Sequence, residues 1–187
     1  MTVKLLKPKR FEDERGWFSE TYNRRRELGL GIDVEFCQDN HSLSGPIGVL
    51  RGLHFQGPPH AQVKLVRCVR GRIWDIAVDI RKGSPTFGRW VAAELSAQNG
   101  HQLYVPAGFA HGFVTLQPDT EVEYKVNAYY DRDSEGGVIW DDPTIAAPWP
   151  TPPSGPILSD KDRVLPSLAE LNSPFDYDGE PLTVVES

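Results

Sequence analysis

The chain has 187 residues, of which 39% are hydrophobic and 25% are charged, and its mass is 20.9 kDa. This is the composition of one globular domain, and no apolar run approaches the roughly 18–20 residues of a membrane span. The net charge of −6 argues against nucleic-acid binding, which favours a basic surface. We see no signal peptide, and two cysteines are too few for a disulfide scaffold, so we expect a cytoplasmic protein that binds neither nucleic acid nor membranes.

The chain is expected to form a single domain over residues 1–187. We divide it into an N-terminal arm over about 1–45, a barrel core over about 46–130, and a C-terminal strap and helix over about 131–187. The proline-rich segment 145–156 is predicted to be extended and to belong to this strap.

Short β-strands separated by turns dominate the middle of the chain. Alternating or β-branched segments with Gly, Pro, Asn or Asp between them predict strands at 63–70, 73–80, 87–95, 102–105, 111–116 and 121–130. Turn signals about every ten residues are typical of an all-β sandwich or barrel. We expect only short helices, near 23–28 and 159–164.

One spacing pattern resembles the second cupin motif, G-x5-P-x-G-x2-H-x3-N. It runs from Gly100 through Pro106, Gly108 and His111 to Thr115, which replaces the final Asn. The Pro and Gly would shape a tight corner, after which His111 points inward from the next strand. The fold that this resemblance implies is a cupin-type jelly-roll β-barrel or sandwich.

The first cupin motif is degenerate. Gly48-x5-His54-x-Gln56 has Gln where metal-binding cupins have a second His, and Lys64 stands where they carry a Glu ligand. Because a cation in place of a carboxylate repels a metal ion, the usual site is broken and we expect neither a metal nor a cofactor. His54 and His111 would then remain in the barrel without a metal.

Several longer blocks, in order along residues 8–166, resemble the dTDP-4-dehydrorhamnose 3,5-epimerase family. The blocks are residues 13–16, 38–40, 50–56, 78–81, 83–88, 108–113 and 158–162. The resemblance implies a cofactor-independent homodimer that acts on a dTDP-4-keto-6-deoxyhexose. It would invert C3 and C5, converting dTDP-4-dehydro-6-deoxy-D-glucose into dTDP-4-dehydro-L-rhamnose.

Such an epimerase needs a base on one face of the sugar, an acid on the other, and a positive charge or donor at the enolate oxygen. The resemblance makes His54 the base, with Asp162 orienting its ring, and Tyr124 the proton donor. It places Lys64 and His111 beside the oxygen of the enolate. An ammonium is costly inside a barrel unless it meets negative charge, which the enolate supplies as the reaction proceeds.

The remaining implied contacts hold the nucleotide. Arg15 and Arg51 match positions for the diphosphate and nucleotide, because a guanidinium binds phosphate bidentately. Gln38 and Asn40 match residues that hydrogen-bond the base. Further positions are Phe18 as a stacking surface, Glu20 across the dimer interface, and Tyr130, Glu135 and Lys161.

Some of these assignments have structural alternatives. Asp162 also completes a capping box with Ser159, and Tyr124 also suits a barrel aromatic with a paired hydroxyl. Asp75 is either a partner of a histidine or of Lys64, or simply a buried structural group. Three alternative functions stay open: an epimerase that inverts only C3 or only C5, a metal-dependent cupin enzyme, and a non-catalytic cupin that binds a sugar nucleotide.

Overall fold

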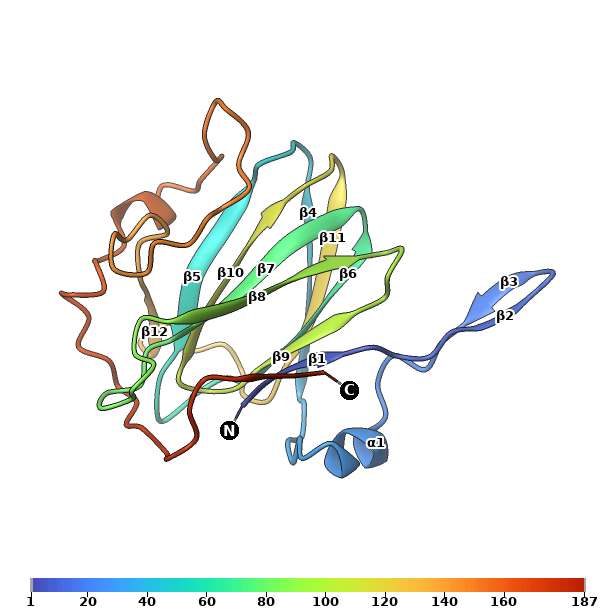
Figure 1. Cartoon of the computed structure of the whole chain (residues 1–187), viewed down its shortest axis with the longest axis horizontal. Helices are drawn as coiled ribbons and strands as arrows, with labels where there is room; N and C mark the ends of the chain where they lie inside the picture. Colours follow the sequence, from blue (N-terminus) through green and yellow to red (C-terminus); the bar gives the residue numbers. More distant parts are fainter. Residues whose placement is uncertain (1, 187) are drawn as a thin grey trace.

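Two mainly antiparallel β-sheets pack face to face in the computed structural model, which describes residues 2–186 (Figure 1). The six-stranded sheet has the order β13 (Val184–Glu186), β1 (Val3–Leu6), β9 (Gln102–Val105), β6 (Lys64–Arg70), β11 (Thr120–Val126), β4 (Gln38–Ser44). The five-stranded sheet has the order β12 (Glu135–Gly137), β5 (Leu50–Gln56), β10 (Phe109–Thr115), β7 (Arg72–Asp79), β8 (Trp90–Ser96). The predicted all-β jelly-roll architecture is confirmed.

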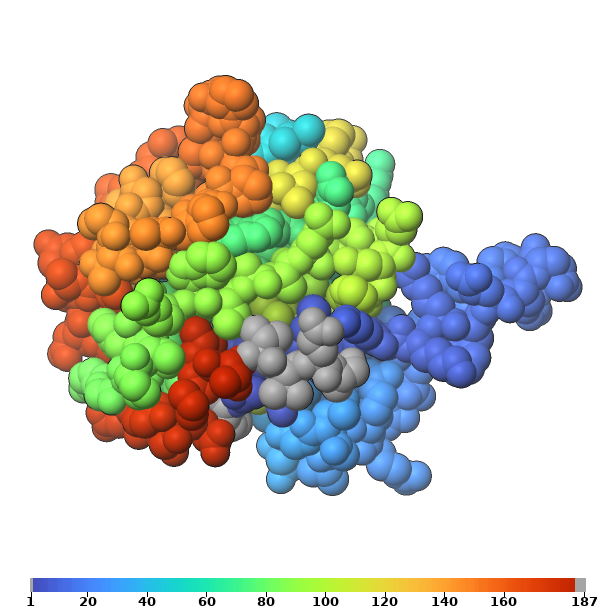
Figure 2. Space-filling view, viewed as in Figure 1, coloured from blue at the N-terminus to red at the C-terminus, as the bar shows by residue number. Residues whose placement is uncertain are grey.

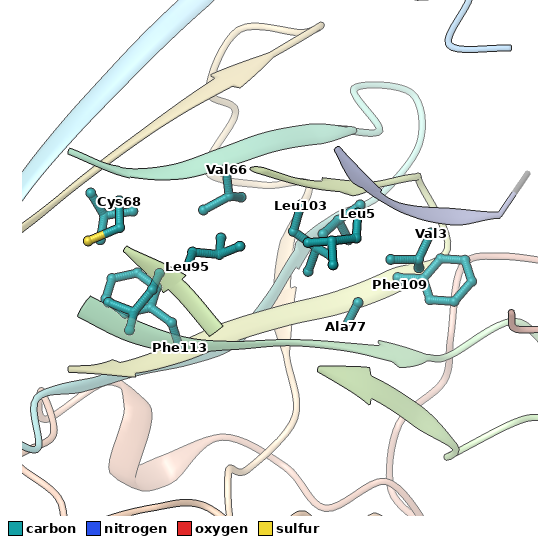
Figure 3. Packing of buried hydrophobic residues seen from close by; sticks show 12 residues of the cluster. Val3, Leu5, Val66, Cys68, Ala77, Leu95, Leu103, Phe109 and Phe113 are labelled. Atoms are coloured by element: carbon teal, nitrogen blue, oxygen red, sulfur yellow. The ribbon is translucent and has the colours of Figure 1, made fainter. Parts of the chain in front are cut away.

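The core between the sheets follows from the two-residue period of the strands. Val66 and Leu103 from the six-stranded sheet meet Ala77, Phe109 and Phe113 from the five-stranded sheet, and all five are buried (Figure 3). Burying such side chains stabilises the fold by roughly 1.5–3 kcal/mol for each large one. The apolar packing of these two faces fixes the positions of the strands that carry the site.

Strand β7 is buried on both faces, because the C-terminal segment covers the outer side of its sheet. Ile73 and Ala77 belong to the core between the sheets, whereas Ile76 and Val78 belong to a second cluster with residues of the segment 138–175. Asp75 shares the period of Ile73 and Ala77, so its carboxylate points between the sheets. A charged group at that position needs a partner inside the barrel.

Three tryptophans hold the strap to the outer face of the five-stranded sheet. Trp74 packs edge-on against Trp90 and Trp149, with ring centroids 5.9 and 5.1 Å away. The Trp90 indole donates to the Ile145 carbonyl, and the Trp149 indole donates to the Trp140 carbonyl. The strap therefore has a fixed course toward the short 3₁₀ helix η1 (Asp162–Val164).

Only two short helices are present in residues 2–186. Helix α1 (Arg24–Gly29) begins after Asn23, whose side chain accepts from the backbone N–H groups of Arg25 and Arg26. The helix expected at 159–164 is the single turn η1 (Asp162–Val164). No helix in this part of the chain is long and apolar enough to cross a membrane.

The strand expected at 121–130 ends early, at Val126. Residues 127–131 leave the sheet because side-chain amides, in place of a neighbouring strand, form hydrogen bonds with their backbone groups. Gln62 donates to the Ala128 carbonyl, and Gln56 both donates to the Tyr129 carbonyl and accepts from the Asp131 N–H. The expected strand at 87–95 is also shifted, to Trp90–Ser96, because residues 84–89 form a hydrogen-bonded turn.

Strands β5 and β10 approach each other very closely at Gly52. Its φ is +128°, and a Cβ atom there would lie 2.6 Å from the Gly112 Cα and 2.8 Å from the His111 carbonyl oxygen. Only glycine fits such a position. The close approach brings His54 directly opposite His111 in the register of the two strands.

A hairpin of β2 (Phe11–Asp13) and β3 (Gly16–Phe18) projects from the body of the protein (Figures 1 and 2). Its aromatic side chains Phe11, Trp17 and Phe18 are 53%, 56% and 69% exposed. The hairpin thus offers apolar surface that the rest of the chain does not cover.

Candidate active site

A cavity of about 450 Å³ lies between the sheets and is closed on one side by the strap. Residues of β4, β5, β6, β10 and β11 line it, together with residues of the segment 157–162. Seven of the residues that the sequence singled out lie on its wall: Arg51, His54, Lys64, His111, Tyr124, Lys161 and Asp162.

His54 and Asp162 form a hydrogen-bonded pair on this wall. The His54 Nε2 lies 2.6 Å from Asp162 Oδ1, and the carboxylate is nearly fully buried while a quarter of the imidazole is exposed. Burial alone would raise the pKa of Asp162, but the hydrogen bond and charge of His54, with contacts from Ser159 and Gly52, outweigh burial and lower it. Asp162 therefore stays ionised and can hold a protonated imidazole.

The capping interpretation of Asp162 is also partly present in the structure. Its backbone N–H donates to Ser159 Oγ over 3.2 Å. The short helix η1 thus places the Asp162 backbone, while the side chain is left to face His54. The capping role and the pairing with His54 are therefore compatible, because Ser159 binds the Asp162 backbone and His54 binds its carboxylate.

Lys64, Asp75 and His111 form a second charged cluster. Asp75 is fully buried and its two oxygens each lie 3.0 Å from His111 Nε2. Burial lowers the pKa of Lys64 to about 8, although the charges of Asp75 and Glu135 oppose this shift. Burial likewise lowers the pKa of His111 and raises that of Asp75, so each group is held away from its charged form by desolvation.

Tyr124 shares the six-stranded sheet with Lys64 and lies across the cavity from Asp75 and His111. It lies on β11 of the six-stranded sheet, whereas His54 lies on β5 of the five-stranded sheet. Burial raises the pKa of the Tyr124 phenol, despite the opposing charge of Arg51. The phenol therefore keeps its proton at neutral pH, on the wall opposite the imidazole.

Polar groups continue from the cavity to its rim. The Tyr130 hydroxyl donates to Glu135 over 3.2 Å, and Glu135 forms an ion pair with Lys161. Gln38 and Asn40 lie on β4, on the same side of the strand as Ser42, which lines the cavity. These side chains extend the polar wall away from His54 toward the edge of the sheet.

Three predicted site residues in or next to the projecting hairpin lie away from the cavity of their own chain. Arg15 pairs with Asp13 in the projecting hairpin, Phe18 is exposed, and Glu20 lies 3.8 Å from Arg26. None of the three is on the cavity wall. These three residues were assigned to the site by resemblance to the family. The resemblance does not show where the N-terminal arm lies relative to the cavity of the same chain.

The donor set does not suit a metal ion. Within residues 2–186, no three or more His, Cys, Asp and Glu side chains are grouped so that they could hold one. Lys64 and Gln56 occupy the positions of two cupin ligands, and the Gln56 amide is taken up by backbone groups. A cation next to two histidines opposes metal binding. That the protein works without a metal or cofactor stays a prediction.

Apolar wall residues are the part of the site that sequence reasoning missed. Phe113 and Leu158 line the cavity beside the polar groups. Leu158 lies in one of the blocks that resemble the family. Phe113 follows His111 by two residues, so the two-residue period of a strand predicts that both side chains face the same side.

Comparisons with known proteins show which family this chain is similar to. A family model described as dTDP-4-dehydrorhamnose 3,5-epimerase matches residues 1–170. The chain is 54% identical to a protein of that name from Sinorhizobium fredii, over 94% of this chain and 89% of the relative.

Two solved structures are also similar to this chain. A Bacillus anthracis dTDP-4-dehydrorhamnose 3,5-epimerase with TDP and PPi bound is 53% identical, with a TM-score of 0.85 over 88% of this chain and 93% of the other. A Legionella pneumophila dTDP-6-deoxy-D-glucose-3,5-epimerase in complex with dTDP-4-keto-L-rhamnose is 42% identical, with a TM-score of 0.89 over 95% of this chain and 94% of the other.

The His54–Asp162 pair predicts one tautomer of the neutral imidazole. A carboxylate only accepts, so the proton lies on Nε2 and Nδ1 is the basic nitrogen. Long-range ¹⁵N NMR should therefore show the Nε2–H form in the wild type and a mixture of tautomers in Asp162→Asn, whose amide both donates and accepts. A wild-type ring protonated on Nδ1 would contradict this geometry.

Proposed function

This chain belongs to the dTDP-4-dehydrorhamnose 3,5-epimerase family, and on that premise we propose how its residues carry out the reaction. It is an isomerase that converts dTDP-4-dehydro-6-deoxy-D-glucose into dTDP-4-dehydro-L-rhamnose by inverting C3 and C5. One observation carries the mechanism: a paired imidazole and a protonated phenol face each other across a cavity that also contains a buried cation.

His54 removes the proton. Hydrogens on C3 and C5 are acidic because the C4 ketone accepts the electron pair as an enolate. The basic Nδ1 of His54 takes the proton, and Asp162, hydrogen-bonded to Nε2 at 2.6 Å, stabilises the imidazolium that forms. A general base of this kind contributes about 10²–10⁴ in rate.

Lys64 and His111 stabilise the enolate. Both line the same cavity as His54 and Tyr124, and Lys64 is bound to the backbone by donating to the His54 carbonyl over 3.4 Å. Burial disfavours the Lys64 ammonium. The negative charge that develops at the C4 oxygen compensates it. This interaction strengthens as the enolate forms and so lowers the barrier.

Tyr124 returns a proton from the opposite side. A phenol whose pKa is raised by burial is protonated at neutral pH and can donate to the carbanion. Because removal and return take place on opposite faces, the centre is inverted. A module that only binds a sugar nucleotide would have no need of this paired arrangement.

The nucleotide occupies the polar wall beyond the sugar. Arg51 and Lys161 line the cavity and provide positive charge for the diphosphate, with Tyr130 and Glu135 at the rim. We assign Gln38 and Asn40 on β4 to contacts with the base, as the resemblance to the family implies. The cytoplasmic location expected from the sequence stays a prediction.

We also propose that the chain is a homodimer in which the projecting hairpin reaches the partner. Arg10 holds the hairpin in place, since its guanidinium stacks on Trp17 at 4.1 Å and donates to the Ala97 carbonyl at 2.6 Å. An exposed aromatic cluster of this kind marks an interface. Phe18, Glu20 and Arg15 would then all contribute to the nucleotide site of the partner.

Sedimentation equilibrium tests the dimer. We expect about twice 20.9 kDa for the wild type and a shift toward the monomer for a Phe11→Ser/Trp17→Ser variant, which loses the apolar contact. Val164→Ser is the matched control, because Val164 is 80% exposed and lies outside the hairpin, so its mass should not change. A wild type that stays monomeric at micromolar concentration would refute the arrangement.

The function is tested by solvent exchange with Tyr124→Phe. In D₂O the wild type should give inverted product with deuterium at both C3 and C5. The variant keeps His54 and Lys64, so label should still enter the substrate at C3, while inverted product falls by roughly 10²-fold or more.

Other results have definite meanings. Label at one centre only would identify an enzyme that inverts C3 alone or C5 alone, and no label in the wild type would identify a binding protein. Exchange and inversion lost together in Tyr124→Phe would show that the tyrosine is not a simple acid on the opposite face.

A further inference from the structure

The turn that joins β8 to β9 is closed by its own side chains. The Asn99 side chain accepts from the backbone N–H groups of Ser96 and His101 over 3.0 and 2.9 Å. The Asn99 N–H in turn donates to Ser96 Oγ over 3.0 Å. These bonds fix the shape of the turn and leave the carbonyls of Ala97 and Gln98 to accept from another part of the chain.

The guanidinium of Arg10, the residue before β2, binds both carbonyls. Its Nη2 donates to the Ala97 carbonyl over 2.6 Å, and its Nη1 donates to the Gln98 carbonyl. Gly100 leaves space for the group, because a Cβ atom there would lie 2.8 Å from Arg10 Nη2. A guanidinium is a rigid, planar donor, so two bonds to a preformed turn also fix the orientation of its plane.

The plane of the same guanidinium holds the hairpin. Arg10 Cζ lies 4.1 Å from the ring centroid of Trp17. Trp17 is paired with Glu12 in the register of β2 and β3, and Arg10 is two residues from Glu12, so Arg10 and Trp17 share one face of the hairpin. Stacking of a guanidinium on an indole combines cation–π attraction with apolar contact. Arg10 thus binds the body of the protein with its edge and the hairpin with its plane.

The segment that returns from the hairpin is held at its base. The Thr21 carbonyl accepts from Gln102 Nε2, and the Glu20 carbonyl accepts from Arg26 Nη1, each over 2.8 Å. The Arg10 contact extends further from the body, to a ring within β3. It therefore sets the direction in which the hairpin projects (Figure 1).

We infer that Arg10 is a positioning residue for the nucleotide site of the partner subunit. The inference rests on the proposed function, in which Arg15, Phe18 and Glu20 of one subunit complete the site of the other. These residues lie in or next to the hairpin, so its direction determines where they meet the substrate. A hairpin that is already ordered binds more tightly, because less conformational entropy is lost on binding.

Arg10→Met tests this inference, because methionine keeps apolar contact with Trp17 and removes the donors. KM for the nucleotide sugar should rise about tenfold or more, while kcat stays within about twofold, since the base, acid and cation come from the barrel of the same chain. Arg25→Met is the matched control. It removes the same charge from an exposed position on α1 and should change neither constant.

A mixed dimer shows on which subunit Arg10 acts. One chain carries Arg10→Met, and the other carries His54→Asn, which removes the base and keeps an intact hairpin. Two different affinity tags allow the mixed dimer to be purified. Its working site lies in the Arg10→Met chain and receives the intact hairpin of the other chain. KM should therefore return to the wild-type value, with about half the wild-type kcat per dimer, because one of two symmetric sites works.

Four results would overturn the inference while the epimerase activity stands. They are a wild-type KM in Arg10→Met, a kcat that falls as far as KM rises, a mixed dimer that keeps the raised KM, and an Arg10→Met variant that sediments as a monomer. The last would show that Arg10 holds the subunits together instead of orienting the substrate contacts. A wild type without turnover would refute the proposed function, and the inference would fail with it.

Discussion

The rest of the site depends on an ammonium group held between two apolar sheets. An unpaired charge in such surroundings is costly, and the charge that most favours the Lys64 ammonium is that of the fully buried Asp75 on β7. Asp75 is itself shared with His111 on β10. Strands β6, β7 and β10 must therefore keep their register, and the arrangement leaves the cation only partly neutralised until an enolate forms beside it.

The catalytic pair couples the barrel to the strap that covers it. His54 belongs to a barrel strand, but Asp162 arrives from the C-terminal segment, whose course is fixed by the tryptophan contacts on the outer face of the five-stranded sheet. The same segment closes the cavity through Leu158 and Lys161. Packing on the outer face of the five-stranded sheet thus determines the position of the Asp162 carboxylate beside His54.

Period-2 patterns and turn residues were enough to predict most central strands, because these follow from local geometry. The inward direction of His111 was predicted from the resemblance to the second cupin motif. The contact of Asp162 with His54 spans 108 residues and could be assigned only by resemblance. The early end of β11 and the role of Gln56 were not predictable, since they depend on side chains that compete for the backbone of residues 128–131. The direction in which the N-terminal hairpin projects could not be predicted either. Its aromatic side chains are exposed, so no buried face of the same chain gives them a sequence pattern.

The central claim, that the Lys64 ammonium stabilises the enolate, is tested most directly by measuring exchange of the substrate C3 hydrogen against pH in D₂O. The pKa of Lys64 is about 8, and only the protonated form can stabilise the anion. Exchange by the wild type should therefore fall as pH rises through about 8, and Lys64→Met should be slower by roughly 10²-fold or more at pH 7. Exchange by Lys64→Met near the wild-type rate, with the same fall above pH 8, would contradict the account.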